Sequence, residues 1–142
     1  MSGLLQNQGL RALRAFVRRS GDRGLERTIG SERGLARVFA GAAARFDPGR
    51  AEGFTGELQF DLHRSSGALS HWVITVAHER ATARPGATEG AALTARLSVA
   101  DAVRILSGEL DAGAAILDGR LDLLGDFGVA MLLGPMFGAT KG

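Results

Sequence analysis

The N-terminal third of the chain has the hydrophobic period of helices. Within Leu4–Arg19, apolar residues recur at Leu10, Leu13 and Val17, and arginines occupy much of the remaining surface. This spacing predicts a basic amphipathic helix. Three glycines between residues 21 and 30 then interrupt the pattern and predict an irregular segment.

A second helical stripe follows this segment. Its apolar positions, at steps of three and four residues, are Leu35, Val38, Phe39, Ala42 and Phe46. Ser31 is expected to cap the start of this helix, and Glu32 suits its first turn. The Asp47-Pro48 step is expected to end it, because proline disfavours helical geometry at the preceding residue.

From Gly56 the pattern changes from helical spacing to alternation. Apolar and polar residues alternate through four segments, which predicts four strands, the first two joined in an antiparallel hairpin through a turn at residues 65–67. A further turn is expected at Pro85-Gly86. The positions on the apolar face are Leu58, Phe60 and Leu62; Trp72, Ile74 and Val76; Ala81 and Ala83; and Leu93, Ala95 and Leu97.

The pattern then returns to helices. Ser98 and Asp101 match the Ser-x-x-Asp arrangement found at helix starts, and the apolar residues that follow keep helical spacing as far as Gly108. Asp111–Asp118 reads as a second helix with mostly small side chains. Small residues facing the sheet leave volume unless neighbouring side chains close in, although the ordinary alternative is a tightly packed core.

One more strand and one more helix complete the chain. Leu121 and Leu123 predict a short fifth strand. Asp126 is expected to cap a nearly all-apolar helix that runs to a break at Gly134-Pro135. Strands grouped together, with helices packed on one face, predict an α+β fold.

Composition narrows the class of protein. The 142 residues suit a single domain, and the lack of cysteine excludes disulfides and thiolate chemistry. The net charge is only +2, so we expect no nucleic-acid partner. The charge is uneven, because residues 1–50 hold ten arginines and four acidic residues while the remainder holds seven basic and eleven acidic residues. With no secretory signal or transmembrane run visible, we expect a cytoplasmic protein.

Candidate catalytic residues are few, and none forms a motif. Serines at 65, 66 and 70 lack a Gly-x-Ser-x-Gly elbow, and the histidines at 63, 71 and 78 form no chelating pair. Asp126-Phe127-Gly128 matches a kinase motif in letters only, since the glycine-rich loop and strand lysine are missing. Asp118 and Asp122 flank Arg120 and are interpreted as a cap and an outward residue that pair with it. We therefore expect no catalytic residue, no metal and no cofactor.

The C-terminal block resembles a known family. A helix over residues 98–108 ends in a Gly-Glu-Leu step and is followed by Gly119-Arg120-Leu121, Gly125-Asp126 and an apolar helix. Together with Gly53-Phe54-Thr55-Gly56 and Trp72, this arrangement resembles the sterol carrier protein 2 domain, the non-specific lipid-transfer family. The resemblance covers about Ser31 to Gly138. Arginine usage and the abundance of alanine and glycine favour a bacterial stand-alone member.

The resemblance implies a fold and a ligand. It implies a five-stranded, mainly antiparallel sheet covered by helices, with a hydrophobic tunnel between them, in a lipid-binding domain over 31–142. Residues 1–30, a basic helical extension, lie outside the usual extent of this family. The resemblance implies non-catalytic binding and transfer of a fatty acyl, sterol-like or isoprenoid and quinone-like molecule. By matching segments, the expected cavity lining is Phe60, Trp72, Ile74, Val103, Leu106, Ile116, Leu117, Met131, Leu132, Met136 and Phe137.

Two further functions stay open at this point. The domain could be a ligand-free interaction or homodimerisation module that supports a partner enzyme. A small enzyme is the third reading and would need a perturbed acid facing the cavity, with Asp61 and Asp126 as the candidates. The basic helix within residues 1–20 is interpreted either as a contact with anionic membranes or as a solvated face on a packing helix.

Overall fold

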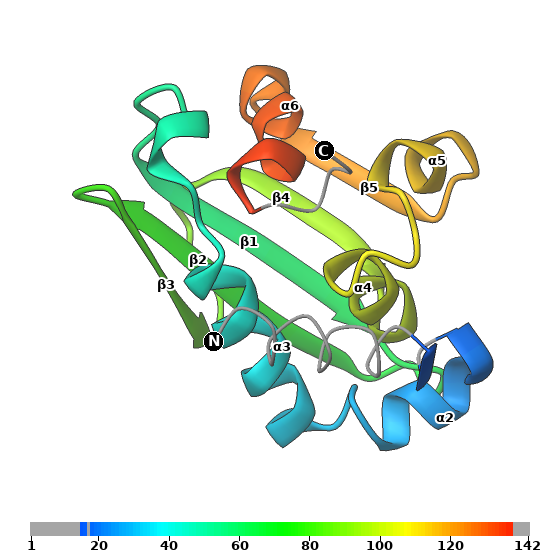
Figure 1. Cartoon of the computed structure of the whole chain (residues 1–142). Coiled ribbons are helices and arrows are strands. Elements are labelled where there is room, and N and C mark those ends of the chain that lie inside the picture. Colours follow the sequence, from blue (N-terminus) through cyan, green and yellow to red (C-terminus); the bar gives the residue numbers. More distant parts are fainter. Residues whose placement is uncertain (1–14, 17, 138–142) are drawn as a thin grey trace.

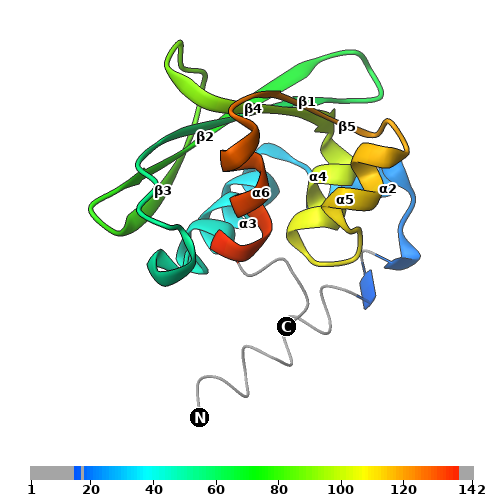
Figure 2. The same cartoon turned by 90° about the horizontal axis from the view of Figure 1, so that it is seen from above.

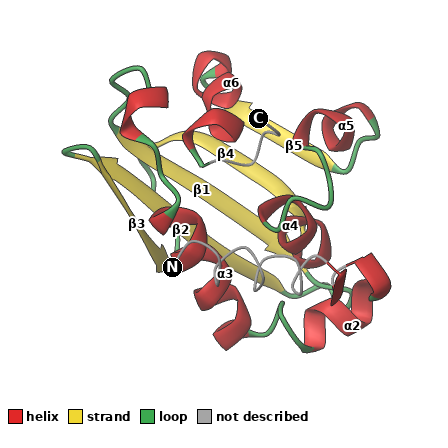
Figure 3. Cartoon of the chain, in the orientation of Figure 1, coloured by secondary structure: helices red, strands yellow, loops and turns green. Residues whose placement is uncertain are grey.

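The computed structural model of the chain describes residues 15, 16 and 18–137. A five-stranded sheet carries the described helices on one face (Figure 1), which is plain when the sheet is seen edge-on (Figure 2). The strands are β1 (Gly56–His63), β2 (Leu69–Ala77), β3 (Arg80–Pro85), β4 (Ala91–Ser98) and β5 (Leu121–Gly125). The helices are α2 (Asp22–Arg27), α3 (Glu32–Ala44), α4 (Val99–Leu106), α5 (Ala112–Leu117) and α6 (Phe127–Met136), with a short 3₁₀ turn η1 at Pro48–Arg50. Figure 3 shows the helical layer in front of the strands.

The strand order is β3-β2-β1-β4-β5. β1 pairs with β2 antiparallel and with β4 parallel, and the β2–β3 and β4–β5 pairs are antiparallel. The predicted α+β fold with a mainly antiparallel sheet is therefore confirmed. Its single parallel pair arises because the chain returns from β3 at one edge to the far side of β1, a step that alternation along the sequence does not reveal.

The return from β3 to β4 crosses the face of the sheet opposite the helices. Thr88 in this connection donates from its backbone N to Oε1 of Gln59 and from its hydroxyl to Oε1 of Glu57, both over 2.8 Å. Val73, beside these residues on β2, is fully buried although it points away from the helices. The connection between β3 and β4 thus covers part of the polar face of the sheet and is hydrogen-bonded to it.

The core lies between the other face of the sheet and the helices. Leu58, Leu62 and Ile74 from the strands are at most 1% exposed, as are Leu35 and Phe39 from α3. The helix starts follow the predicted caps: the side chain of Ser31 accepts from Gly34 N, that of Ser98 from Asp101 N, and that of Asp126 from Gly128 N. These three capping predictions are confirmed.

Two expected boundaries differ from the structure. The irregular segment expected between residues 21 and 30 contains α2, which forms because Leu25 buries its side chain completely in the core. The last helix continues through Pro135 to Met136, since the burial of Met136 and Phe137 compensates for the hydrogen bond that proline cannot make.

The N-terminal prediction falls largely outside the described residues. The helix expected over Leu4–Arg19 includes residues 1–14 and 17, which are not described, and residues 15, 16, 18 and 19 are helical. The division into an extension over 1–30 and a domain over 31–142 stays a prediction.

Candidate functional site

An apolar cavity lies between the sheet and the helices α4, α5 and α6. It has a volume of about 70 Å³. The sheet contributes Phe60, Ile74, Ala95, Leu97 and Leu121 to its lining, and the helices and the residue after α6 contribute Ala102, Ile105, Leu106, Ala112, Leu133, Gly134 and Phe137. The lining side chains are hydrocarbon throughout, so the cavity offers dispersion contacts and no charge to a molecule inside it.

The hollow arises where small residues from different elements face one another. Ala95 on β4, Ala102 on α4, Ala112 on α5 and Gly134 on α6 all line it. Interiors close such gaps when larger neighbouring side chains can move in. Of the alanines that the sequence places on the apolar face of the strands or in the helix over 111–118, Ala95 and Ala112 line the cavity.

An aromatic cluster bounds the cavity toward α3. The Phe39 ring meets Phe60 edge-on at a centroid distance of 5.2 Å and stacks on Trp72 at 4.9 Å, with an interplanar angle of 1°. Phe60 lines the cavity. Trp72 does not line it and packs instead against the Phe39 ring. Aromatic pairs of this kind add stabilisation to the area they bury, so these ring contacts stabilise this wall of the cavity.

The structure brings four of the predicted lining residues together at the cavity: Phe60, Ile74, Leu106 and Phe137. Trp72, Val103 and Met136 are buried in the core outside the cavity lining, and Leu132 is partly buried against that core. Ile116, Leu117 and Met131 are exposed, because α5 and α6 turn these side chains toward the surface. Contact of any of the eleven with a ligand stays a prediction.

The sequence reasoning missed most of the helical lining. Ala102, Ile105 and Leu106 share a helical stripe at steps of three and one, of which only Leu106 was included among the expected lining residues. The expected lining consists of large apolar side chains, whereas a cavity is also bounded by small side chains such as those of alanine. Two of the small lining residues could have been predicted. Ala95 lies on the predicted apolar face of its strand, and Ala112 lies in the predicted helix of mostly small side chains.

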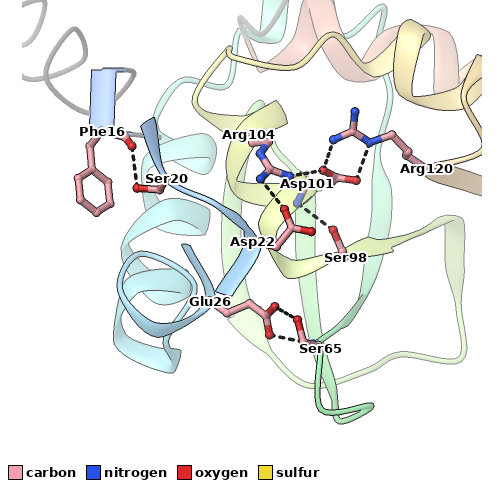
Figure 4. A network of polar contacts seen from close by, with 9 residues as sticks. All are labelled: Phe16, Ser20, Asp22, Glu26, Ser65, Ser98, Asp101, Arg104 and Arg120. Atoms are coloured by element: carbon pink, nitrogen blue, oxygen red, sulfur yellow. Dashed lines mark hydrogen bonds and ion pairs between the residues drawn. The ribbon is translucent and has the colours of Figure 1, made fainter. Parts of the chain in front are cut away.

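An ion-pair network centred on the buried carboxylate of Asp101 joins α4 to α2 and to the turn before β5 (Figure 4). Arg120, in the turn before β5, and Arg104, on α4, both donate to the carboxylate of Asp101, which is 7% exposed. Arg104 also bonds Asp22 of α2. Burial opposes ionisation of Asp101, but the two arginines outweigh it and leave its pKa below the usual value. Arg120 therefore pairs with Asp101 rather than with Asp118 or Asp122, which corrects the sequence interpretation.

Gly119 and Gly125, two glycines of the motifs that resemble the family, have backbone conformations that favour glycine. Gly125 has a φ of +122°, and a Cβ there would lie 2.5 Å from the backbone oxygen of Ala92 on β4. Gly119 has a φ of +73° in open space. Gly119-Arg120 thus turns the chain so that Arg120 reaches Asp101, and Gly125-Asp126 ends β5 and caps α6.

The acids considered for catalysis point elsewhere. Asp61 lies on the sheet face opposite the helices, where Nδ1 of His71 is 2.7 Å from its Oδ1 and Nε of Arg96 is 3.6 Å from its Oδ2. Burial would raise the pKa of Asp61, but hydrogen bonds from Gln59 and His71 hold it below the usual value. Asp126 is the exposed cap of α6. Neither lines the cavity as the enzyme reading requires.

The described residues include neither a metal-binding cluster nor a membrane-spanning helix. Within them, no group of three or more histidine, aspartate or glutamate side chains is arranged to hold a metal ion. No helix in the same part of the chain combines the length and the apolar character needed to cross a bilayer.

Comparison with known families decides the relationship. The model of the SCP-2 sterol transfer family matches residues 39–138. The chain belongs to this family. The match begins within α3 and spans the whole sheet, the cavity lining and α6, so the resemblance seen in the sequence is confirmed. No curated protein matches the chain.

Solved structures with the same fold include sterol carrier proteins and a much longer sec-alkylsulfatase. The crystal structure of sterol carrier protein 2 like 2 from Aedes aegypti is 23% identical, with a TM-score of 0.59 over 81% of this chain and 98% of that one. Sterol carrier protein 2 from Aedes aegypti, in complex with the C16 fatty acid palmitate, is 17% identical over 73% and 97%, with a TM-score of 0.53. The sec-alkylsulfatase Pisa1 from Pseudomonas sp. is 25% identical, with a TM-score of 0.60 over 78% of this chain, which spans only 17% of that enzyme.

Proposed function

We propose that this family member binds the hydrocarbon part of a lipid in the cavity between the sheet and α4–α6, and transfers it without catalysing a reaction. The observation that carries the proposal is the cavity lining, which is hydrocarbon on the sheet side and on all three helices. The palmitate complex of the Aedes aegypti relative supports a fatty acyl ligand. Sterol-like and isoprenoid or quinone-like molecules share the apolar character that such a lining recognises.

The cavity must widen to accept such a ligand. Its volume of about 70 Å³ is well below the ~300–1,000 Å³ of ligand pockets. Burial of methylenes contributes ~0.8 kcal/mol each, so a sixteen-carbon chain supplies about 12 kcal/mol before ordering costs. We propose that this energy drives α5 and α6 apart, because α5 has six residues and buries only Ala115 fully.

The proposed ligand contacts follow from this opening. Phe60, Ile74, Leu106 and Phe137 already line the closed cavity. Ile116 and Leu117 on α5 and Met131 on α6 belong to helices that line the cavity, and they are 44%, 89% and 67% exposed. We propose that these exposed side chains turn onto the ligand when the helices separate, which would explain why an apolar surface is left in contact with water.

Native mass spectrometry tests the proposal. Freshly purified protein should carry an adduct of lipid mass that organic extraction removes, and incubation with palmitate should restore an adduct of palmitate mass. A bare mass that stays bare after incubation with fatty acids, sterols and quinones would reject lipid binding.

The alternative function is a ligand-free interaction module that supports a partner enzyme or dimerises. Two observations favour it: the small volume of the closed cavity, and the sec-alkylsulfatase in which a domain of this fold is part of a much longer chain. The same experiment separates the two functions, and a concentration-dependent dimer mass without any adduct would support the module.

We also propose that residues 1–20 contact anionic membranes during transfer. Arg11, Arg14, Arg18 and Arg19 lie in this segment, and basic residues near an anionic surface contribute about 1 kcal/mol each. Cosedimentation with vesicles containing phosphatidylserine should weaken when these arginines are changed to glutamine. Equal binding would leave the segment as a solvated helix face. The lack of cysteine fits the reducing cytoplasm that we infer as the location.

A further inference from the structure

A second and larger hollow lies on the outer side of α3 and α4, separate from the apolar cavity. It has a volume of about 600 Å³, within the range of ligand pockets. Ile29, Val38 and Leu106 are among the apolar residues of its floor. Leu106 also lines the cavity between the sheet and the helices, so this side chain borders both spaces.

The groove is basic along α3. Arg33, Arg37 and Arg45 line it, and none of the described lining residues is acidic. Elsewhere in the described chain, Arg84, Arg104 and Arg120 form ion pairs with carboxylates, whereas the three groove arginines have no such partner. Positive charge thus collects at a concave surface without an internal counter-ion.

Arg45 connects this charge to the cavity wall. Its Nη2 donates to the backbone oxygen of Leu106 over 2.9 Å, which fixes the guanidinium at the end of α4. Burial lowers the pKa of Arg45, as expected for a guanidinium that is partly desolvated without a carboxylate beside it. An anion placed here would supply the missing charge partner, and guanidinium groups suit carboxylate and phosphate oxygens.

We propose that this groove binds the anionic head group, a carboxylate or phosphate monoester, of a single-chain amphiphile whose alkyl chain crosses Leu106 toward the cavity. The site rests on the proposed lipid-binding function and adds to it a preference for anionic over neutral ligands. The apolar floor holds the first part of the alkyl chain, and the arginines of α3 hold the head group.

Decyl phosphate and decanol, titrated calorimetrically below micelle formation, provide matched probes with and without the charge. The full chain should bind decyl phosphate more tightly than decanol. The variant R33Q/R37Q should bind decyl phosphate about tenfold more weakly, the effect of one charge-assisted hydrogen bond, and decanol unchanged. The control R23Q/R27Q removes two exposed arginines at the same spacing on α2, outside the groove, and should bind both probes like the parent chain.

Several results would overturn the head-group site. Equal affinity for both probes, or an equal loss in R33Q/R37Q and R23Q/R27Q, would reject it and leave lipid binding in the cavity intact. Binding of neither probe would reject both proposals. The experiment also tests two alternative occupants of the groove, a second copy of the chain and the chain's own N-terminal residues. A dimer mass that decyl phosphate does not disperse, or nuclear Overhauser contacts between Leu106 and Leu10 or Leu13 that persist at saturation, would overturn the site in their favour.

Discussion

Arg120 donates two hydrogen bonds to the carboxylate of Asp101, from Nε to Oδ2 over 3.0 Å and from Nη2 to Oδ1 over 2.6 Å. This bidentate pair holds the turn before β5 against the first turn of α4. Both elements contribute to the cavity, Leu121 from β5 and Ala102 from α4, while neither charged residue lines it. This ion pair thus fixes the relative position of two apolar walls. It gives a structural role to the Gly119-Arg120-Leu121 step, one of the motifs on which the family resemblance rests.

Asp101→Asn should destabilise the protein by about 2 kcal/mol, because it removes charge-assisted hydrogen bonds to two arginines that stay partly accessible to water. The free energy of unfolding in urea at pH 7 measures this loss. Asp122→Asn is the control, since Asp122 is exposed on β5, and it should change stability by less than about 0.5 kcal/mol. Equal effects of the two variants would show that the ion pair contributes little.

The stability of the parent chain should fall in acid through the same carboxylate. The pKa of Asp101 is lower in the folded protein than its ordinary value of 3.8, so its contribution is complete above that value. The contribution is lost as the pH falls through the lower, folded-state pKa. Urea unfolding from pH 7 to pH 2 should show a smaller acid loss in Asp101→Asn than in the parent chain. Parallel curves would contradict the assignment.

Ala95→Val should block lipid binding without harming the fold. Two added carbon atoms enter a cavity of about 70 Å³, and valine suits a strand, so stability should stay level or rise by up to about 1 kcal/mol. Palmitate adducts in native mass spectrometry should fall at least about tenfold, a change of about 1.4 kcal/mol. Thr94→Val on the opposite face of β4 is the matched control. Unchanged palmitate binding in Ala95→Val would place the ligand elsewhere.

Gly125→Ala and Gly119→Ala should differ in cost although both glycines have positive φ. At Gly119 the new methyl meets open space, and the left-handed backbone alone costs about 1 kcal/mol. At Gly125 it also collides with the Ala92 oxygen, so the loss should reach about 3 kcal/mol. Urea unfolding of both variants compares them directly. Equal losses would mean that β4 and β5 separate at little cost.

Phe39→Leu should change both stability and the fluorescence of Trp72, the only tryptophan. Loss of the stacked ring and of the edge contact with Phe60 should cost about 2 kcal/mol and shift the emission. Phe127→Leu, at a position 76% exposed on α6, is the control and should leave the emission unchanged. An unshifted spectrum in Phe39→Leu would show that Trp72 does not sense its stacking partner.

The elements that the sequence predicted well are those whose pattern is local. β1 and β2 were predicted from alternation, and the starts of α3, α4 and α6 from their capping residues, because period and caps depend on neighbours a few positions away. α2 was missed since two glycines hide a single buried leucine, Leu25, whose burial depends on distant contacts.

The cavity was predicted less completely, for a physical reason. Periodicity identifies which side chains face inward, and Phe60, Ile74, Leu106 and Phe137 were found in this way. A void is defined by the distance between facing elements, so Ala102, Ile105 and Gly134 could be assigned only after α4 and α6 were placed over the sheet. The same holds for Trp72, which faces inward but is covered by Phe39.

By itself the sequence determined the order and type of most elements, the inward face of each strand, the hydrocarbon character of the core and the family, because these depend on side-chain period and on short motifs. Only the tertiary structure decided that β1 and β4 run parallel and that Arg120 pairs with Asp101 rather than with Asp118 or Asp122, which are closer to it in sequence. It also decided that Arg33 and Arg37 of α3, and Arg45 at the end of that helix, line one groove together with Leu106. Each of these depends on residues far apart in the chain, whose meeting is set by packing between elements.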